Sequence, residues 1–539
     1  MRAGRTGAVL ASGIGLALLA AACGSSGHAG AGAASRGTAP SASGVVTGAT
    51  ATMLIPSDPG NLNPLTTVTG TTRGLDYFAY DSLIDQTPGG KLVSGLATSW
   101  KQSGNTYTFS LRTGVTCSDG APMTPATVAD NINFLSNPKN KSPLLDLFIP
   151  PDAKASARGT TLTIKLAQPF PFFLEDLTGV WLVCGKGLAD PSSLAEATDG
   201  TGHYVLSSAV PGSQYTFTLR KGYTWGPGGT STATPGLPAK LVVKVVSDPT
   251  TEANLLLQGE ANLANIQGLA SKPLSAAHLF HESQLAPLGE LWFNQAPGHA
   301  TANQKVRTAI ISALDLPELG QVIGQGLGSA PTGLVTLTPK ACPGDTVTGT
   351  LPAYSTSRAA SLLDQAGWTV GPGGTRAKAG KPLSLTLLYA NDIGGDPPSA
   401  FELAAQELQK VGIQVHLVGD STTQLESVIF GTGSWDIVDV PLGINTPSEA
   451  VPFVSGPAAP SGENFSHIDN AAYTALASRA AALPGTSGCS DWDQAEQSLF
   501  RAVDVVPFEN ATEPFWGKGI TFGLNSDGVV PTSLRMLKG

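Results

Sequence analysis

Alternation of apolar and polar residues predicts strands in several parts of this chain. Over residues 106–111, Tyr107, Phe109 and Leu111 would share one face, because successive side chains of a strand point to opposite faces. The turn residues Ser-Asp-Gly follow at 118–120. The pattern therefore predicts a half-buried strand that is followed by a turn.

Helical spacing begins directly after this turn. Thr124 is a suitable N-cap, and Pro125 suits the first helical position, where its missing N–H costs nothing. Val128, Ile132 and Leu135 then recur at i, i+4 and i+7, which gives the predicted helix one apolar stripe. The same spacing recurs in two further stretches, residues 306–314 and 358–366.

A βαβ unit is predicted in the second half of the chain. Residues 383–387 and 413–417 alternate as strands, with His416 on the wetter face, and residues 401–408 between them have helical spacing. Two strands joined by a helix are parallel and connected by a right-handed crossover. We therefore expect an α/β fold with more than one sheet.

The N-terminus has the features of an export signal. Arg2 and Arg5 precede an uncharged apolar stretch, residues 8–22, which is too short to span a bilayer and ends in small residues. Cys23 follows at once and resembles the lipidated cysteine of a bacterial lipobox, although Leu19 lies one residue farther from it than is usual. We expect residues 1–22 to be a signal peptide, with plain secretion as the alternative.

Residues 23–50 are rich in Gly, Ala, Ser and Thr and have almost no large apolar side chain. Such a segment forms no core and behaves as a flexible tether. A lipid on Cys23 would then hold the folded body close to a membrane.

Composition excludes several classes of protein. The 539 residues include 31 Lys and Arg against 40 Asp and Glu, a net charge of −9, which is unsuited to binding nucleic acid. Hydrophobic residues make up 41%, so the chain can form a large core and is long enough for several domains.

Nucleotide motifs are absent or incomplete. The chain has no P-loop sequence GxxxxGK[ST]. Gly324, Gly326 and Gly328 resemble a dinucleotide-binding loop, but Ser329 occupies the place of the last glycine, so we interpret this stretch as a turn.

Catalytic and metal motifs are equally weak. His281 and Glu282 begin an HExxH pattern, but Leu285 stands where the second histidine is needed, and no GxSxG sequence occurs. His278 and His281 could share a helical face and hold a metal, although solvated side chains explain them as well. We expect no catalytic residues, no metal and no cofactor.

A series of short motifs resembles one family in order along the chain. They are similar to the extracellular solute-binding proteins of family 5, the peptide, oligopeptide and nickel receptors of ABC transporters. The matching segments are Asn61–Pro64, Tyr80–Ile84, Leu96–Trp100, Tyr107–Val115, Ser118–Thr124, Gly200–Tyr204, Gln258–Asn262, Phe293–Asn294, Val306–Ala309, Ala313–Asp315 and Arg358–Gly367. His203 replaces the proline of the family's "GTGPY".

This resemblance implies a fold and a mode of action. The fold is the two-lobed periplasmic-binding-protein fold of type II, with an additional domain inserted near the N-terminus. The lobes would close around a ligand, and the closed receptor would dock on a permease that is driven by ATPase subunits. The implied layout is lobe I from residues 51–80, 203–290 and 511–539, an inserted domain from 81–202, and lobe II from 291–510.

Four cysteines remain besides Cys23, and an exported chain can oxidise them. Three pairings are possible. In the layout that the resemblance implies, Cys117 with Cys184 and Cys342 with Cys489 each fall within one domain, so we prefer these pairs.

The resemblance also points to ligand-binding residues. In the family's peptide receptors an Asp pairs with the α-ammonium group of the peptide; the corresponding stretch here begins at Leu442, and Asn445 stands near the place of that Asp. Glu290 falls at a position that faces the cleft in relatives and could favour a cationic ligand. Trp292 and Trp435 are candidates for stacking on a ligand, with core packing as the alternative.

We therefore expect a monomeric, lipid-anchored receptor on the extracytoplasmic face of a bacterial membrane that delivers short peptides to an ABC importer. Nickel chelates or oligosaccharides are alternative cargoes. A ligand sensor that does not transport, or a secreted hydrolase, are alternative functions on the same scaffold.

Overall fold

The computed structural model describes residues 44–87 and 89–538. The expected signal peptide and Cys23 lie outside this range. The expected tether ran to residue 50, yet Val45 already pairs with Leu537, and the N–H of Val46 donates to the carbonyl of Met536 at 2.9 Å. Within the described residues, no helix has both the length and the apolar character that crossing a membrane requires.

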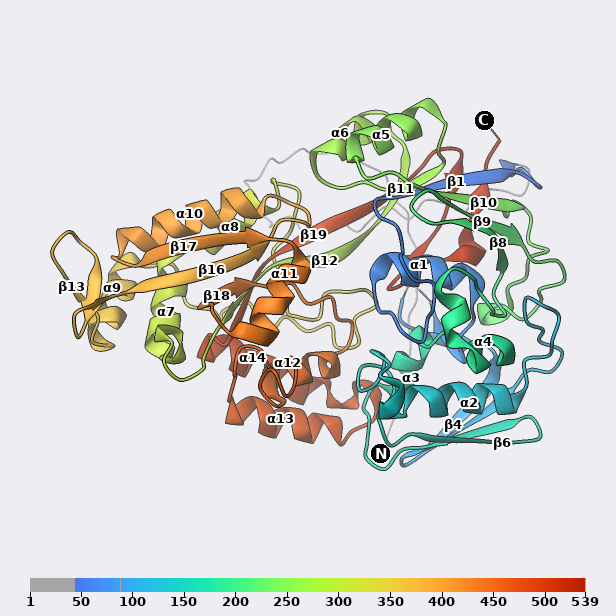
Figure 1. The fold of residues 1–539 in the computed structure, drawn as a ribbon, viewed down its shortest axis with the longest axis horizontal. Helices are drawn as coiled ribbons and strands as arrows, with labels where there is room; N and C mark the ends of the chain where they lie inside the picture. Colours follow the sequence, from blue (N-terminus) through green and yellow to red (C-terminus); the bar gives the residue numbers. More distant parts are fainter. Residues whose placement is uncertain (1–43, 88, 539) are drawn as a thin grey trace, which may run out of the picture. The chain divides into compact units, whose positions relative to one another are not determined.

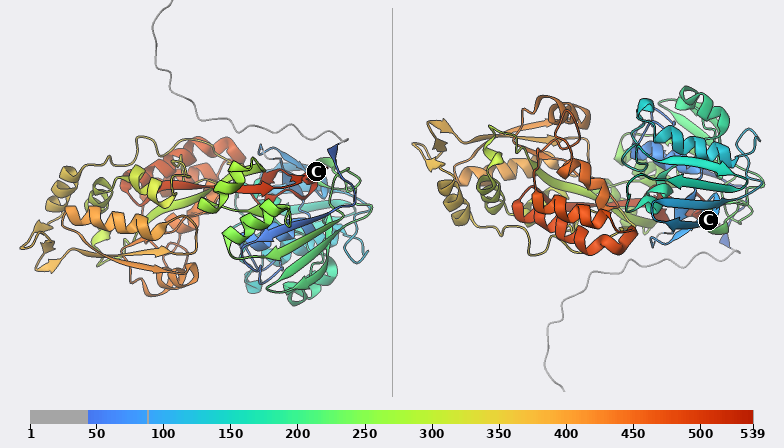
Figure 2. Two further views of the ribbon diagram at one scale, coloured as in Figure 1. Left: turned by 90° about the horizontal axis from the view of Figure 1, so that it is seen from above. Right: turned by 90° about the horizontal axis from the view of Figure 1, so that it is seen from below.

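A ten-stranded mixed sheet organises the described chain (Figure 1). Its strands, in spatial order, are β17 (Gln414–Asp420), β16 (Ser384–Ala390), β18 (Ile437–Asp439), β12 (Phe280–Phe293), β19 (Val505–Gly517), β11 (Leu263–Asn265), β1 (Thr50–Ile55), β10 (Lys240–Val245), β9 (Gln214–Leu219) and β8 (Tyr204–Val210). The orange strands β16 and β17 and the green strands β8–β10 lie at opposite ends of this sheet in both views of Figure 2.

Smaller sheets complete the β structure. A four-stranded sheet has the order β4 (Ala97–Ser103), β5 (Thr106–Leu111), β7 (Thr161–Lys165) and β6 (Lys154–Arg158). The remaining strands form short pairs and one triplet: β2 (Ile84–Gln86) with β3 (Leu92–Ser94), β13 (Thr369–Val370) with β14 (Arg376–Lys378) and β15 (Lys381–Pro382), β20 (Ile520–Thr521) with β23 (Arg535–Met536), and β21 (Leu524–Asn525) with β22 (Gly528–Val529).

Most helices are short and amphipathic, with one buried face. They are α1 (Gly70–Ala79), α2 (Pro125–Leu135), α3 (Phe173–Asp176), α4 (Gly185–Ala189), α5 (Pro249–Gln258), α6 (Lys272–Ala276), α7 (Gln304–Ala313), α8 (Leu316–Ile323), α9 (Thr356–Gln365), α10 (Pro397–Lys410), α11 (Thr422–Ser427), α12 (Val451–Ser455), α13 (Ala471–Ala481) and α14 (Cys489–Ala502). The 3₁₀ turns include η9 (Pro447–Ala450) and η10 (Gly485–Gly488).

The periodic segments of the sequence form the predicted elements. The three apolar side chains of β5 are buried, and Thr124 caps α2 by accepting a hydrogen bond from the Thr127 N–H at 3.1 Å. β16, α10 and β17 form the predicted βαβ unit with parallel strands, and His416 is exposed as expected.

Buried side chains gather in separate clusters near opposite ends of β12 and β19. One large cluster joins α1, α2, β1, β8–β10 and the four-stranded sheet. Two others contain the side chains of α7–α10 and of α13 and α14, and both include residues of β12 and β19. β12 and β19 pair antiparallel along most of their length, so they connect these cores (Figure 1).

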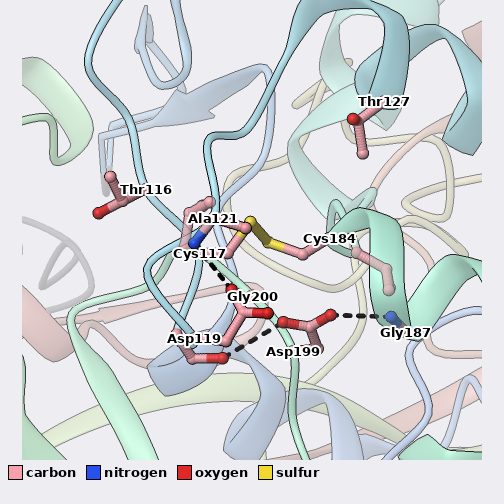
Figure 3. The surroundings of a disulfide bond; sticks show 12 residues. Thr116, Cys117, Asp119, Ala121, Thr127, Cys184, Gly187, Asp199 and Gly200 are labelled. Atoms are coloured by element: carbon pink, nitrogen blue, oxygen red, sulfur yellow. Dashed lines mark hydrogen bonds between the residues drawn. A yellow bond between two sulfur atoms is a disulfide. The ribbon is translucent and has the colours of Figure 1, made fainter.

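Both preferred disulfides are present. Cys117 is bonded to Cys184 and Cys342 to Cys489. The first bond ties the turn after β5 to the start of α4, where Asp199 Oδ2 also accepts a hydrogen bond from the Gly187 N–H at 2.8 Å (Figure 3). Each cross-link limits the freedom of the unfolded chain and so stabilises the fold by about 2–4 kcal/mol.

Candidate ligand-binding site

A cavity of about 690 Å³ lies beside α1, α3 and the middle of β12 and β19. This volume lies within the range that small-molecule sites occupy in proteins, roughly 300–1,000 Å³. Apolar side chains form much of its wall, and they are Met53, Leu54, Ile55, Pro56, Val68, Leu75, Leu147, Phe148, Leu337, Leu442, Ile444, Phe453, Phe515 and Val529.

β12 and β19 each supply one polar residue to the cavity lining. Gln284 on β12 and Glu513 on β19 are direct register partners, and the Gln284 Nε2 donates to Glu513 Oε2 at 3.2 Å. Gln267 also lines the cavity and donates from Nε2 to Glu513 Oε1 at 3.2 Å. Two amides therefore hold the carboxylate of Glu513, a residue of the cavity lining, in place.

Arg73 is the single basic side chain among the described residues that line the cavity. Its Nη2 donates to Asp527 Oδ1 at 2.6 Å and to the Gly179 carbonyl at 3.1 Å, and its guanidinium lies 5.0 Å from the ring centroid of Phe148. A methyl group on Gly179 would come within 2.9 Å of Nη2, so the glycine leaves room for the arginine. These contacts fix Arg73 in place within the structure.

Three carboxyl groups form an acidic part of the wall: Glu175 and Asp176 on α3, and Glu449 on η9. Burial raises the pKa of Asp176 well above its usual value, and the charges of Glu449 and Glu175 raise it further. Burial also raises the pKa of Glu449 to about 7, although its Oε2 accepts a hydrogen bond from the Asn445 N–H at 3.1 Å. Burial likewise raises the pKa of Glu175.

The structure brings two of the residues expected from sequence to this cavity. Leu442 and Asn445 both line it, on the loop between β18 and η9. Asn445 contributes its backbone N–H to Glu449, so this loop also positions an acidic group that the sequence did not single out.

Glu290, Trp292 and Trp435 are buried outside the cavity lining. Glu290 Oε2 accepts a hydrogen bond from the Leu442 N–H at 2.9 Å, so Glu290 supports the loop from behind. The two tryptophans pack on Phe465, at ring-centroid distances of 5.1 Å for Trp292 and 6.0 Å for Trp435. They belong to one hydrophobic cluster, which is the core packing given as the alternative for them.

Sequence reasoning missed Arg73, Asp176, Glu449 and Glu513. Three of these lie in helices or turns rich in apolar residues, where a charged side chain has no periodic signal. The run Phe172–Asp176 offered one clue, since two adjacent acids end an apolar stretch. This clue does not show that Glu449, from a distant part of the chain, lines the same cavity.

The family described as bacterial extracellular solute-binding proteins, family 5 Middle, matches residues 91–451. The nickel-binding periplasmic protein of Escherichia coli (strain K12) is 27% identical over 382 residues, covering 64% of this chain and 66% of that protein, just under two thirds of its length. The periplasmic murein peptide-binding protein MppA of the same organism is 24% identical over 496 residues, covering 85% and 87%.

Solved structures have the same fold. NikA from Brucella suis in complex with Fe(III)-EDTA matches with a TM-score of 0.75 and 24% identity, covering 90% of this chain and 99% of that one. The oligopeptide-binding protein AppA from Bacillus subtilis, in complex with a nonapeptide, matches with a TM-score of 0.73 and 16% identity, covering 92% and 100%.

The expected two-lobed fold of type II is thereby confirmed, and the relatives are binding proteins rather than enzymes. Because the match to the family covers well over half of the chain, the protein belongs to the bacterial extracellular solute-binding proteins of family 5.

Proposed function

We propose that this protein is the lipid-anchored receptor of an ABC importer, and that it captures a short peptide or a related small solute and delivers it to the permease. The observation that carries this proposal is the cavity of about 690 Å³, whose wall is formed by α1 and α3, by the loop before η9, and by the two strands that connect the cores. A cavity built in this way changes shape when the cores rotate about β12 and β19. A ligand that contacts both sides would therefore stabilise the closed form.

The layout expected from sequence forms part of the proposal. Lobe I would comprise residues 51–80, 203–290 and 511–539, the inserted domain 81–202, and lobe II 291–510. In that layout β12 and β19 carry the lobe boundaries. Register shifts between Pro287 and Glu290 interrupt their pairing near one boundary, which suits a point of bending.

The cargo class has two candidates. MppA and AppA are named for peptides, which favours a peptide. The nickel-binding relative and the Fe(III)-EDTA complex of NikA favour a metal chelate as the second candidate. Both are compatible with the cavity's volume and with its mixture of apolar and charged walls.

A thermal-shift screen tests the proposal. The purified protein would be heated with di- to octapeptides, nickel chelates, oligosaccharides and amines. A ligand at 100 times its Kd adds about 2.7 kcal/mol of stability, which moves the Tm of a protein of this size by a degree or more. If no solute shifts the Tm, the receptor function is contradicted.

Anchoring needs a separate experiment. The full chain and its Cys23→Ala variant would be expressed in a bacterial host and fractionated. We expect the full chain to be in the membrane fraction and to be labelled by a fatty-acid analogue. The variant should be neither membrane-bound nor labelled. An unlabelled, freely secreted full chain would contradict the lipid anchor and leave the binding function open.

A further inference from the structure

The cavity wall is unbalanced in charge. The described residues that line it include five carboxyl groups, those of Glu175, Asp176, Glu449, Glu513 and Asp527, against the one guanidinium of Arg73. Asp527 is paired with Arg73, and Glu513 accepts hydrogen bonds from two glutamines. What remains is the group of Glu175, Asp176 and Glu449.

Asp176 is the group that most needs a partner. Asp176 is one of the residues that line the cavity, it is 3% exposed, and neither of its carboxylate oxygens has a hydrogen-bond partner. Buried carboxylates are normally paired, because an isolated one loses its hydration without compensation. The charges that act on Asp176 are those of Glu449 and Glu175, which have the same sign and repel its charged form.

Arg73 does not supply the missing partner. Its Nη2 is bonded to Asp527 and Gly179, and its guanidinium faces the rings of Phe148 and Trp181, at 5.0 and 5.7 Å from their centroids. Its charge lowers the pKa of Glu449, but it is not among the influences that act on Asp176.

The approach of these acids depends on a contact between separate cores. α3 packs Phe173 into the large N-terminal cluster, whereas the preceding Phe172 is fully buried in the cluster of α13 and α14, with its ring centroid 6.4 Å from that of Trp492. The Gly485 N–H also donates to the Pro171 carbonyl at 2.6 Å. Docking of α3 on this cluster therefore places Asp176 in the same cavity wall as Glu449, whose charge acts on it unfavourably.

We propose that the ligand of this cavity carries an organic cation, an ammonium or guanidinium group, which binds between Asp176 and Glu449 and so favours the docked position of α3. This inference rests on the proposed receptor function and names the class of its ligand. A cation at this point would pair with the unpartnered carboxylate and cancel the repulsion that docking creates.

An organic cation fits better than a metal ion. Within residues 44–87 and 89–538, no group of three or more His, Cys, Asp or Glu side chains has the arrangement of a metal site. The remaining walls are largely apolar, with Leu75, Phe453 and Phe515 among them, and they suit the hydrocarbon body of an amine.

The test uses matched pairs of probes on the wild-type protein. Trialanine, trileucine, phenethylamine and agmatine would each be compared with their N-acetyl derivatives, and maltotriose and a nickel–histidine chelate would serve as probes without an organic cation group free to bind. We expect the cationic members to bind at least tenfold more tightly in titration calorimetry than their acetylated partners that lack the charge. For agmatine, whose guanidinium survives acetylation, equal binding of both forms would identify guanidinium as the group recognised.

Variants then assign the effect to this part of the wall. Asp176→Asn and, separately, Glu449→Gln should each remove at least tenfold of the affinity for cationic probes and leave the acetylated tripeptides unchanged. Asp130→Asn is the matched control, because Asp130 is an exposed acid on α2 away from the cavity. Circular dichroism and the Tm of each variant show whether it is folded, and the comparison of probes on the wild type does not depend on any variant.

Three results separate the possible failures. If only maltotriose, the chelate or acetylated peptides bind, the inference is overturned and the receptor function stands. If cationic probes bind but both variants keep the preference, the cation lies elsewhere and the inference is again overturned. If no probe binds at all, the receptor function fails together with the inference.

Discussion

Glu290 holds the loop that carries Leu442. The Glu290 Oε2 accepts the Leu442 N–H at 2.9 Å, and the backbone N–H of Glu290 in turn donates to Asp439 Oδ1 at 2.8 Å. Leu442 lines the cavity, whereas Glu290 is 1% exposed behind it. A buried carboxyl group thus fixes part of the cavity wall without taking part in its lining.

This relationship predicts different outcomes for two substitutions at Glu290. Glu290→Gln keeps an oxygen that can accept the Leu442 N–H, so we expect stability and ligand affinity close to wild type at pH 7. Glu290→Ala removes the acceptor and leaves a void, and should lower the free energy of unfolding by about 2–4 kcal/mol. Urea denaturation of the two variants measures the difference; equal loss in both would contradict the role of the acceptor oxygen.

Asp439 predicts how stability changes between pH 5 and 8. Burial raises the pKa of Asp439 to about 8, although the Glu290 N–H stabilises its charged form. The folded protein therefore holds a proton that the unfolded chain, with its ordinary carboxyl pKa, has released. Stability contributed by this group is present at low pH and is lost as the pH rises towards 8, at up to about 1.4 kcal/mol per pH unit.

Asp439→Asn removes this titration and can keep the hydrogen bond from Glu290. We expect a shallower fall of the free energy of unfolding between pH 5 and 8 than in the wild type, measured by urea denaturation at each pH. Asp130→Asn, the exposed control, should leave the slope unchanged. A slope in Asp439→Asn as steep as in the wild type would contradict the assignment.

His203 is expected to make the free energy of unfolding fall at acid pH. It is fully buried with neither ring nitrogen hydrogen-bonded, and its ring centroid lies 4.2 Å from that of Tyr223. Burial, with the nearby charge of Arg220, lowers the pKa of His203 to about 3. The unfolded chain therefore takes up a proton below about pH 6.5 that the folded protein refuses, and stability is lost as the pH falls.

We expect His203→Phe to be as stable as the wild type at pH 7, because an aromatic ring still packs on Tyr223. At pH 4 the variant should be more stable by about 2 kcal/mol or more, since up to 1.4 kcal/mol per pH unit is no longer lost. Urea denaturation at both pH values measures this. A variant that loses stability on acidification as steeply as the wild type would exclude His203 as the cause.

Arg73 and Arg479 predict a contrast between a buried and an exposed ion pair. The side chains of Arg73 and Asp527 are 11% and 9% exposed, and those of Arg479 and Asp491 are 60% and 25% exposed. Arg73→Met leaves Asp527 and the Gly179 carbonyl without their donor and should cost about 3–5 kcal/mol. Arg479→Met should change the free energy of unfolding far less, because water already solvates both members of this exposed pair.

Thermal or urea denaturation of both variants makes the comparison directly. Ligand binding adds a second measurement, because Arg73 lines the cavity and Arg479 does not. Equal and small losses of stability in the two variants would show that the Arg73 pair is solvated in solution.

The periodic segments could be predicted because their buried and exposed positions alternate at the period of the strand or helix. Tyr107, Phe109 and Leu111 alternate with polar residues since one face of β5 is buried, and the same logic gave β16, α10 and β17. The disulfides followed from the family layout. Each of these predictions depended on neighbours in sequence or on a motif that is continuous in the chain.

The acidic part of the cavity wall could not be predicted, because its residues are far apart in the sequence. Asp176 and Glu449 come from distant segments and line the same cavity, and the adjacent Phe172 is buried beside Trp492 of a third segment. Trp292 and Trp435 show the related difficulty that a large aromatic suits a cleft and a core equally well. Their packing on Phe465, from a third segment, is decided by the tertiary structure alone.

The pairing of Val45 with Leu537 brings the two ends of the described chain side by side. Lys538 donates its N–H to the Gly44 carbonyl at 2.9 Å, so the two ends are adjacent in the structure. A short linker could join them, and new ends could be opened at the exposed turn Gly373-Gly374 without removing a strand. A circular permutant of this kind would carry its attachment point at a chosen turn, so that the body could be tethered or immobilised in a different orientation with its cavity intact.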